Sequence, residues 1–102
     1  RMALIAAPEP NERYCQWSEE FSDVFDALEQ AGFNKSQWFI PNVEQLKLAY
    51  KNCRKHFSAN NYWSSTEASS TNSCYAGFNN GNQGIVSKTF TNCVRAFRRV
   101  TY

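Results

Sequence analysis

The sequence is poor in the residue types on which most catalytic and cofactor sites depend. It has one histidine, His56, and only four glycines, which are scattered along the chain. No histidine relay can be identified for Ser64 or Ser65, and there is no glycine-rich phosphate loop. The acidic residues lie mostly on a predicted helix or at helix ends, not as a catalytic pair. We therefore expect a protein that is not an enzyme and needs no cofactor.

Long apolar runs and a strong net charge are also missing. No apolar stretch approaches the ~20 residues that span a bilayer, so we expect no membrane insertion. The net charge of +2 is too small to indicate a nucleic-acid partner. Basic residues do cluster in residues 51–56 and at Arg95, Arg98 and Arg99. The first cluster is compatible with a polyanion-binding patch or with a solvated helix end, since cations favour a helix C-terminus.

The cysteines do not have the spacing of a metal site. The four are Cys15, Cys53, Cys74 and Cys93, and no two of them form a C-x₂₋₄-C pair. His56 follows Cys53 by three residues, but a metal needs more ligands than these two, so we expect no bound metal. In a secreted domain the four would form two disulfides in one of three pairings. Free thiols in the core are the alternative.

The first half of the chain predicts a strand and two helices in a single α+β domain. Residues 2–7 form a short apolar run that ends at Pro8. The first helix is predicted to be capped by Ser18 and ended by Gly32. The second begins just after Pro41. The predicted inward faces are Trp17, Phe21, Val24, Phe25 and Leu28 in the first helix, and Val43, Leu46, Ala49, Tyr50 and Cys53 in the second, after a capping box of Asn42 and Gln45.

The second half of the chain predicts short strands. A strand begins at Tyr62, and the alternation in residues 74–79 turns Phe78 toward the core and Tyr75 and Asn79 toward solvent. The Asn80-Gly81 pair predicts a two-residue hairpin turn, followed by a return strand at 85–90. Residues 94–100 form the last predicted strand, whose mixed alternation indicates a bulge or burial on both faces.

Four motifs in residues 38–102 carry a family resemblance. They are WFIPNVEQL at 38–46, YWSSTE at 62–67, FNNG at 78–81 and VRAFR at 94–98. Their order and spacing resemble the Lcl C-terminal domain family, small C-type-lectin-like domains named after a bacterial collagen-like adhesin. That family's pattern runs W-x-L-P-x-x-x-E-L, Y-W-S-S-T, an aromatic-F-x-x-G strand and V-R-x-V-R. Ile40 replaces the family's leucine.

The resemblance implies a C-type-lectin-like fold with two helices packed on a twisted, mainly antiparallel sheet. It favours free thiols, because the family fold does not depend on disulfides. It also implies structural motif residues: Trp38 and Trp63 as buried anchors, Arg95 and Arg98 paired with carboxylates such as Glu44 and Glu67 or with backbone carbonyls, and Pro41, Leu46, Ser64 and Ser65. The whole chain, 1–102, is then one domain, which we expect to be the C-terminal part of a longer protein.

The function that the resemblance implies is binding without chemistry. We expect a display module of a virion, in a tail fibre or capsid decoration, or of a bacterial surface protein. Its partner would be a receptor glycan or protein, and the parent protein could bring copies together as a homo-oligomer. The alternative is a structural decoration or cement domain that holds a virion or fibre together by protein contacts only.

Amide side chains supply the candidate binding surface. We expect it to consist of Tyr75, Asn79, Asn80, Asn82 and Gln83, with Asn60 and Asn61 as neighbours. Ordinary turn chemistry in a solvated hairpin explains the same asparagines equally well. The tripeptide Glu9-Pro10-Asn11 matches the calcium-and-mannose motif of vertebrate C-type lectins. It precedes the first predicted helix and has no Trp-Asn-Asp strand after it, so we assign it no sugar-binding role.

Overall fold

Two helices and two sheets make up the fold. The computed structural model describes residues 2–101. Three single-turn 3₁₀ helices connect the larger elements: η1 (Glu9–Asn11), η2 (Lys35–Gln37) and η3 (Arg54–His56). The larger elements in chain order are β1 (Met2–Ala6), β2 (Arg13–Gln16), α1 (Ser22–Gln30), β3 (Trp38–Phe39), α2 (Val43–Cys53), β4 (Asn61–Glu67), β5 (Asn72–Gly77), β6 (Gln83–Ser87), β7 (Thr91–Val94) and β8 (Phe97–Thr101). The predicted α+β class with two helices is confirmed.

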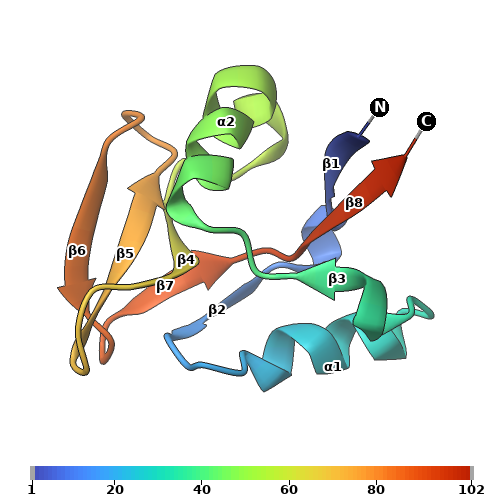
Figure 1. Ribbon diagram of the computed structural model, residues 1–102, viewed down its shortest axis with the longest axis horizontal. Helices are drawn as coiled ribbons and strands as arrows, with labels where there is room; N and C mark the ends of the chain where they lie inside the picture. The colour runs from blue at the N-terminus through green and yellow to red at the C-terminus, as the bar shows by residue number, and fades with distance from the viewer. Residues whose placement is uncertain (1, 102) are drawn as a thin grey trace.

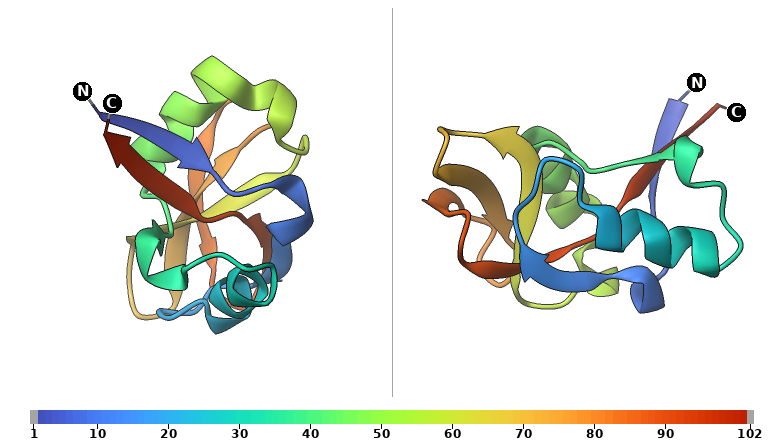
Figure 2. Two further views of the ribbon diagram at one scale, coloured as in Figure 1. Left: turned by 90° about the vertical axis from the view of Figure 1, so that its right-hand side faces the viewer. Right: turned by 90° about the horizontal axis from the view of Figure 1, so that it is seen from below.

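The strands form two sheets where the sequence predicted one. The smaller sheet has the order β1-β8-β3, and the larger has the order β2-β7-β4-β5-β6 with a parallel pair at β4 and β7. The predicted last strand is divided at Arg95 and Ala96, both buried, where the chain leaves β7 in one sheet and enters β8 in the other (Figure 1). The irregularity predicted in this segment is therefore a crossing between sheets. Because β1 pairs with β8, the two ends of the chain lie side by side (Figure 2).

Helix α1 starts later than its sequence predicts. Phe21 adopts a left-handed backbone conformation with φ of 45°, so the helix begins only at Ser22. The Ser18 hydroxyl accepts a hydrogen bond from the Phe21 N–H at 2.8 Å, before the helix. The prediction that Ser18 caps the helix is therefore wrong. Gly32, with φ of 92°, follows the last turn as predicted.

Helix α2 has the predicted start and inward face. Asn42 Oδ1 accepts from the Gln45 N–H at 2.8 Å, and Gln45 Oε1 accepts from the Asn42 N–H at 2.9 Å. Both arms of the capping box are thus present. Leu46 and Ala49 are buried, and Tyr50 is partly buried at the same face.

The core has two parts, one on each face of the larger sheet. Helix α2 covers one face together with Tyr62, Phe78 and Phe97. Helix α1 belongs to the other part, which includes Trp38 and Trp63. Neighbouring side chains on β4 therefore point into different parts of the core. Trp63 is fully buried and Trp38 is 8% exposed, which confirms both as buried anchors.

The connection from β5 to β6 is longer than the predicted two-residue turn. Gly77 N–H donates to the Asn82 carbonyl at 2.6 Å, and Gly81 N–H donates to the Gly77 carbonyl at 2.9 Å. Among the described residues of this connection only Gly81 has a positive φ, of 78°. The five residues 78–82 thus form a closed loop, and β6 ends at Ser87, before Phe90. The Asn80-Gly81 pair therefore predicts the position of the β5–β6 connection correctly, but not its length.

Candidate functional site

The predicted amide side chains come together at one end of the larger sheet. The loop at 78–82 carries exposed Asn79, Asn80 and Asn82. Asn61 pairs with Gly77 across β4 and β5, and the Phe78 N–H donates to the Asn60 carbonyl at 2.9 Å. We call this set the amide surface; it consists of Asn60, Asn61, Asn79, Asn80, Asn82 and Gln83. Two segments separated in sequence therefore lie side by side at this end of the sheet.

Tyr75 lies on the other face of the sheet and is not part of the amide surface. It pairs with Trp63 across β4 and β5 and packs against the part of the core that contains α1. Its hydroxyl lies over Gly84, 2.7 Å from where a Cβ atom on that glycine would be. The predicted alternation is correct, but the second face is covered by a core and not by water. Tyr75 is therefore separated by the sheet from the other predicted binding residues.

Tyr50 is the aromatic side chain that borders the amide surface. Its ring lies against Gly81, where a Cβ atom would be 2.6 Å from Cε1 of the ring. The ring also packs edge-on against Phe78, with 5.6 Å between ring centroids, and Arg54 Cζ lies 5.2 Å from its centre. The sequence placed Tyr50 on the inward stripe of α2. Only the fold shows that this end of the stripe meets the 78–82 loop.

Three amide oxygens meet over Gly77. A Cβ atom on Gly77 would lie 3.0 Å from Oδ1 of Asn61, 3.0 Å from Oδ1 of Asn80 and 3.1 Å from Oδ1 of Asn79. We call these three atoms the oxygen cradle. A residue with any side chain at position 77 would push against all three oxygens. The absence of a side chain at Gly77 is therefore what allows them to converge.

A buried charged network holds the chain that leads into the amide surface. Arg95 Nη2 lies 2.8 Å from Oε1 of Glu12, and Arg95 Nη1 donates to the His56 carbonyl at 2.7 Å. The Tyr62 hydroxyl also donates to Glu12 and accepts from the Ser58 N–H at 2.9 Å. Burial, followed by the bond to Glu12, raises the pKa of the Tyr62 hydroxyl. These hydrogen bonds hold residues 56–62 in place on the buried network, which positions Asn60 and Asn61.

The expected arginine partners are different in the structure. Arg95 pairs with a carboxylate and a backbone carbonyl as expected, but the carboxylate is Glu12. Glu44 instead lies 4.0 Å from Lys47, and Glu67 pairs with Lys88. Within residues 2–101 no carboxylate lies at ion-pair distance from Arg98.

Two of the family-like motifs contact each other. The Ser65 N–H donates to the carbonyl of buried Pro41 at 2.8 Å, and the Val43 N–H donates to Oγ1 of Thr66 at 3.2 Å. Ser64 is buried and its hydroxyl donates to the Cys74 carbonyl at 2.8 Å. The serines of the YWSSTE segment therefore join β4 to the start of α2 and to β5. Their observed contacts are structural.

Two other sequence features also have structural roles. Asn11 of the Glu9-Pro10-Asn11 tripeptide is buried, and its Nδ2 donates to the Ala27 carbonyl in α1 at 3.4 Å. It faces the protein and not a ligand. All four cysteines are free thiols, as the resemblance favours.

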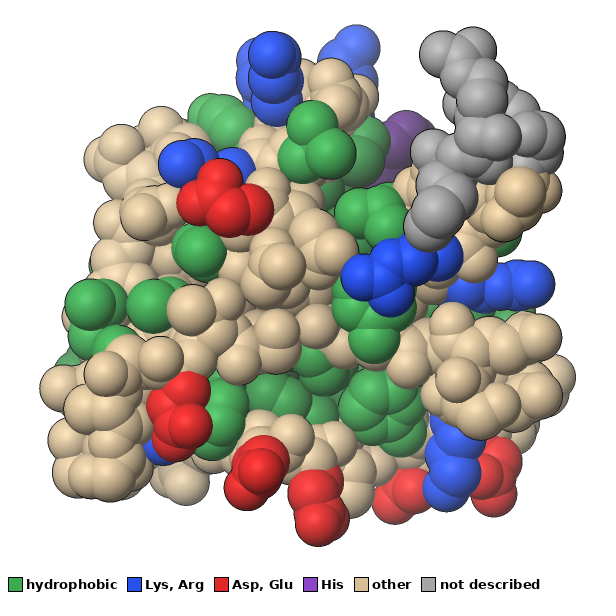
Figure 3. Space-filling model, viewed as in Figure 1, with side chains coloured by type: hydrophobic (Ala, Val, Ile, Leu, Met, Phe, Trp, Pro, Cys, Tyr) green, Lys and Arg blue, Asp and Glu red, His purple; other side chains and the backbone are tan. Residues whose placement is uncertain are grey.

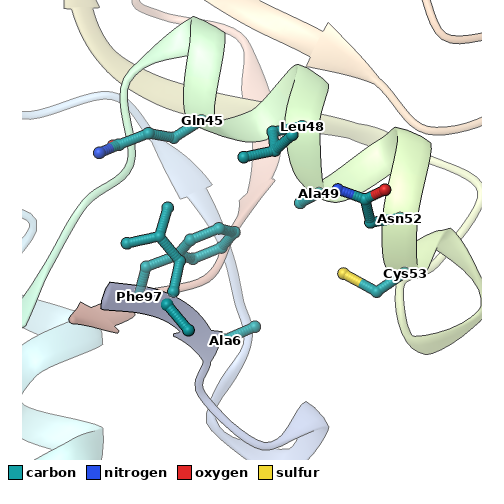
Figure 4. A pocket seen from close by; sticks show the side chains of 9 residues that line it. Ala6, Gln45, Leu48, Ala49, Asn52, Cys53 and Phe97 are labelled. Atoms are coloured by element: carbon teal, nitrogen blue, oxygen red, sulfur yellow. The ribbon is translucent and has the colours of Figure 1, made fainter. Parts of the chain in front are cut away.

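A concave region lies between α2 and the β1–β8 pair. It is a groove of about 280 Å³ lined mostly by apolar side chains, including Leu48, Ala49 and Phe97 (Figure 4). Cys53 and Asn52 lie at one end of it. An apolar lining of this kind suits a hydrophobic side chain better than a sugar.

Charged side chains are distributed unevenly over the face of the molecule seen in Figure 3. Acidic groups gather along the edge of the molecule where α1 lies, and basic groups project beyond α2 (Figure 3). The six members of the amide surface are all uncharged. Recognition there would depend on hydrogen bonding more than on charge.

Comparisons with known proteins leave the family open. A scan against models of protein families finds no match, and a search of curated proteins finds no significantly similar sequence. Within the described part of the chain, neither helix has the length and apolar character needed to cross a membrane.

Proposed function

We propose that the protein is a non-catalytic, C-type-lectin-like binding module that recognises a receptor glycan or protein at the surface of a virion or bacterial cell. The observation that carries this proposal is the amide surface, six uncharged amides gathered from two segments beside the ring of Tyr50. The resemblance to the Lcl C-terminal domain family supports the display context.

The amide surface has the chemistry of a recognition surface. Each amide offers both donors and acceptors, so the set can match hydroxyls, carbonyls or backbone groups of a partner. Asparagine has a short side chain and loses little rotamer entropy when it is ordered. The loop that carries it is closed by two backbone hydrogen bonds and braced by Tyr50. Such a preorganised surface binds without the free-energy cost of ordering a flexible loop.

The position of the chain ends suits display. The ends lie together at one side of the molecule, and the β5–β6 loop lies toward the other side (Figure 1). A domain attached to a larger protein through these ends would therefore present the amide surface outward.

A glycan array and receptor capture with the purified protein test the proposal. The variant Asn79→Ala/Gln83→Ala removes two exposed amides. The matched control Gln16→Ala/Gln30→Ala removes two exposed amides elsewhere. We expect the control to keep the ligands of the native protein and the first variant to lose them. Equal retention by both folded variants would contradict the proposal.

A structural decoration role is the second candidate, and the apolar groove favours it. Leu48 at the groove is 51% exposed, which suits contact with a neighbouring subunit. If this role is correct, Leu48→Lys will abolish incorporation into the parent assembly while Asn79→Ala/Gln83→Ala has no effect. The opposite pattern, normal assembly with lost recognition, supports the binding module.

A further inference from the structure

Strand β1 has one edge that pairs with no other strand. The smaller sheet has the order β1-β8-β3, so β8 lies on one side of β1 and no strand of the described residues lies on the other. Directly after β1, the Ala7 N–H donates to the Ala96 carbonyl at 2.8 Å. Residues bonded to a given partner alternate along an antiparallel strand, so the backbone groups of Ile5 face β8 and those of Leu4 and Ala6 face the other edge. No backbone hydrogen bond from another part of the described chain reaches these groups.

The free edge of β1 lacks the features that usually protect an edge strand. Such strands commonly carry charged residues, proline or a bulge, which discourage pairing with another chain. The sequence of β1 is MALIA, without charge or proline, and its register with β8 is regular over all five pairs. The edge is therefore suited to accept a further strand.

The apolar groove runs beside this edge. It is lined by Leu4 and Ala6 on β1 and by Leu48 on α2 (Figure 4). Leu4 and Ala6 also line the adjoining concave region, which extends to Lys55 and His56. Unpaired backbone groups and open apolar space thus occur together along the same strand.

Basic side chains are concentrated at one end of this surface. Lys51, Arg54 and Lys55 are exposed, and within residues 2–101 no carboxylate lies at ion-pair distance from any of them. Glu9 also lines the adjoining region, and the charge of Arg95 there is already paired. The remaining excess of positive charge favours a partner that brings a carboxylate to this end.

We propose that the free edge of β1 binds an extended segment of a partner protein, which adds to the smaller sheet as a further strand. The segment places apolar side chains in the groove and an acidic side chain near Lys55. In this mode of binding, main-chain hydrogen bonds supply affinity and pockets for alternate side chains supply specificity. The inference goes beyond the proposed function, because it concerns a surface other than the amide surface.

Antiparallel pairing predicts the pattern of the bound segment. Residues directly opposite each other in an antiparallel pair have side chains on the same face, so those opposite Leu4 and Ala6 point into the groove. The same residues direct their N–H and C=O groups toward β1. The segment should therefore have apolar residues at alternate positions. Because Lys55 lies near the C-terminal end of β1, the acidic residue should be at the N-terminal end of the segment.

Other occupants match this surface less well. The β1 strand of a second copy brings no carboxylate to the basic end, since residues 2–6 are uncharged. A purely apolar ligand, such as a fatty acyl chain, would leave the backbone groups of Leu4 and Ala6 without partners.

A synthetic peptide with alternating residues tests the inference. The probe is the terminally blocked peptide Asp-Val-Thr-Val-Thr-Val-Thr. N-methylation of its valines removes the donors that face β1, whereas N-methylation of its threonines removes donors that face away. Titration calorimetry should show binding of the parent peptide, a loss of about tenfold or more for the valine-methylated form and about threefold or less for the threonine-methylated form. Equal losses, or no binding of the parent peptide, would overturn the inference.

Amide hydrogen exchange locates the peptide on β1. In the protein alone, the N–H groups of Leu4 and Ala6 should exchange faster than those of Ile5 and Ala7, which face β8. Bound peptide should slow exchange at Leu4 and Ala6 by about tenfold or more, because these groups gain hydrogen bonds. Exchange at Ile5 should change little. Slower exchange confined to other parts of the chain would contradict strand addition.

Two exposed apolar residues provide a matched pair of variants. Leu48 lies at the groove and is 51% exposed, and Ile85 lies on β6 and is 62% exposed. Leu48→Glu should weaken binding of the peptide by about tenfold or more, because it places a charge in the apolar groove. Ile85→Glu should bind the peptide normally. Equal binding by both folded variants would exclude the groove from the site.

The acidic end of the peptide can be tested with Lys55→Gln. This variant should bind the parent peptide about two- to fivefold more weakly, the range for an exposed ion pair. It should bind a peptide with asparagine in place of the aspartate as well as the native protein does. Equal effects on both peptides would contradict the predicted orientation of the segment.

Sedimentation of the protein alone tests a second copy as the occupant. A dimer that the peptide dissociates would assign the edge of β1 to pairing between copies and would overturn the proposed partner. The peptide site and the amide surface can also be separated. Leu48→Glu should lose the peptide and keep the ligands found on the glycan array, whereas Asn79→Ala/Gln83→Ala should keep the peptide.

Discussion

Arg95 and Glu12 are 83 positions apart in the chain, yet Nη2 of the arginine lies 2.8 Å from Oε1 of the glutamate. The two side chains are only 2% and 13% exposed. Arg95 occupies the point where the chain passes from one sheet to the other, and it also bonds the His56 carbonyl. The Arg95 side chain therefore joins the N-terminal segment, through Glu12, to the loop that leads to the amide surface, through the His56 carbonyl.

Breaking this pair should strongly destabilise the fold. Arg95→Met keeps an apolar stem against Phe57 but leaves the Glu12 carboxylate without its cation. We expect the free energy of unfolding to fall by about 3–5 kcal/mol, as measured by urea denaturation. Lys35→Met, which breaks the exposed Lys35–Glu29 pair, should leave the free energy of unfolding almost unchanged. Similar small losses in both variants would show that the buried pair contributes little.

The register of α2 can be tested with two leucines on the same helix. Leu46 is 1% exposed and Leu48 is 51% exposed. Leu46→Ala should lower the free energy of unfolding by about 2–5 kcal/mol, because it leaves a cavity in the core. Leu48→Ala should change it by no more than about 0.5 kcal/mol. A small effect at Leu46 in thermal or urea unfolding would show that the inward face is wrong.

The contact between Tyr50 and the 78–82 loop can be measured through two glycines. Gly81 and Gly32 both have positive φ, but a Cβ atom meets the Tyr50 ring at Gly81 and nothing within 4 Å at Gly32. Gly32→Ala should cost about 1–2 kcal/mol from backbone strain alone. Gly81→Ala should cost more, because the ring must also move. Equal losses in urea denaturation would mean that Tyr50 does not brace the loop.

Stability should decline in alkaline solution, partly through Cys93. Burial, and after it the nearby Glu12 carboxylate, raises the pKa of the Cys93 thiol from 9.0 to about 11. The folded protein therefore keeps a proton that the unfolded chain has lost. This contribution to stability is complete below pH 9 and is lost as the pH rises toward about 11. Urea denaturation between these pH values should show a smaller decline for Cys93→Ala than for the native protein. Identical declines would contradict the assignment.

Local signals in the sequence identified the parts of the fold that depend on neighbouring residues. The capping box of Asn42 and Gln45 formed as expected because its two bonds span three residues. Gly32 ended α1 for a similarly local reason. The start of α1 was misjudged because the left-handed conformation of Phe21 is not visible in an apolar pattern.

Contacts between residues far apart in the chain could not be predicted from local sequence patterns. Strand alternation separated Phe78 from Tyr75 correctly, but it could not show that both faces of the larger sheet are covered. The partner of Arg95 was missed because Glu12 lies 83 positions away and just after a lectin-like tripeptide. The Asn-rich turn is recognisable locally, whereas the meeting of Asn61 with Asn79 and Asn80 over Gly77 requires the pairing of β4 with β5.

The most direct measurement is attachment of the parent particle or cell that displays the domain with Asn79→Ala and Gln83→Ala. If the amide surface is the binding site, attachment to the target should weaken by about tenfold or more, in line with the loss of residues central to an interface. The domain should remain folded, and Gln16→Ala/Gln30→Ala should attach normally. Unchanged attachment by the folded Asn79→Ala/Gln83→Ala variant would contradict the assignment of binding to the amide surface.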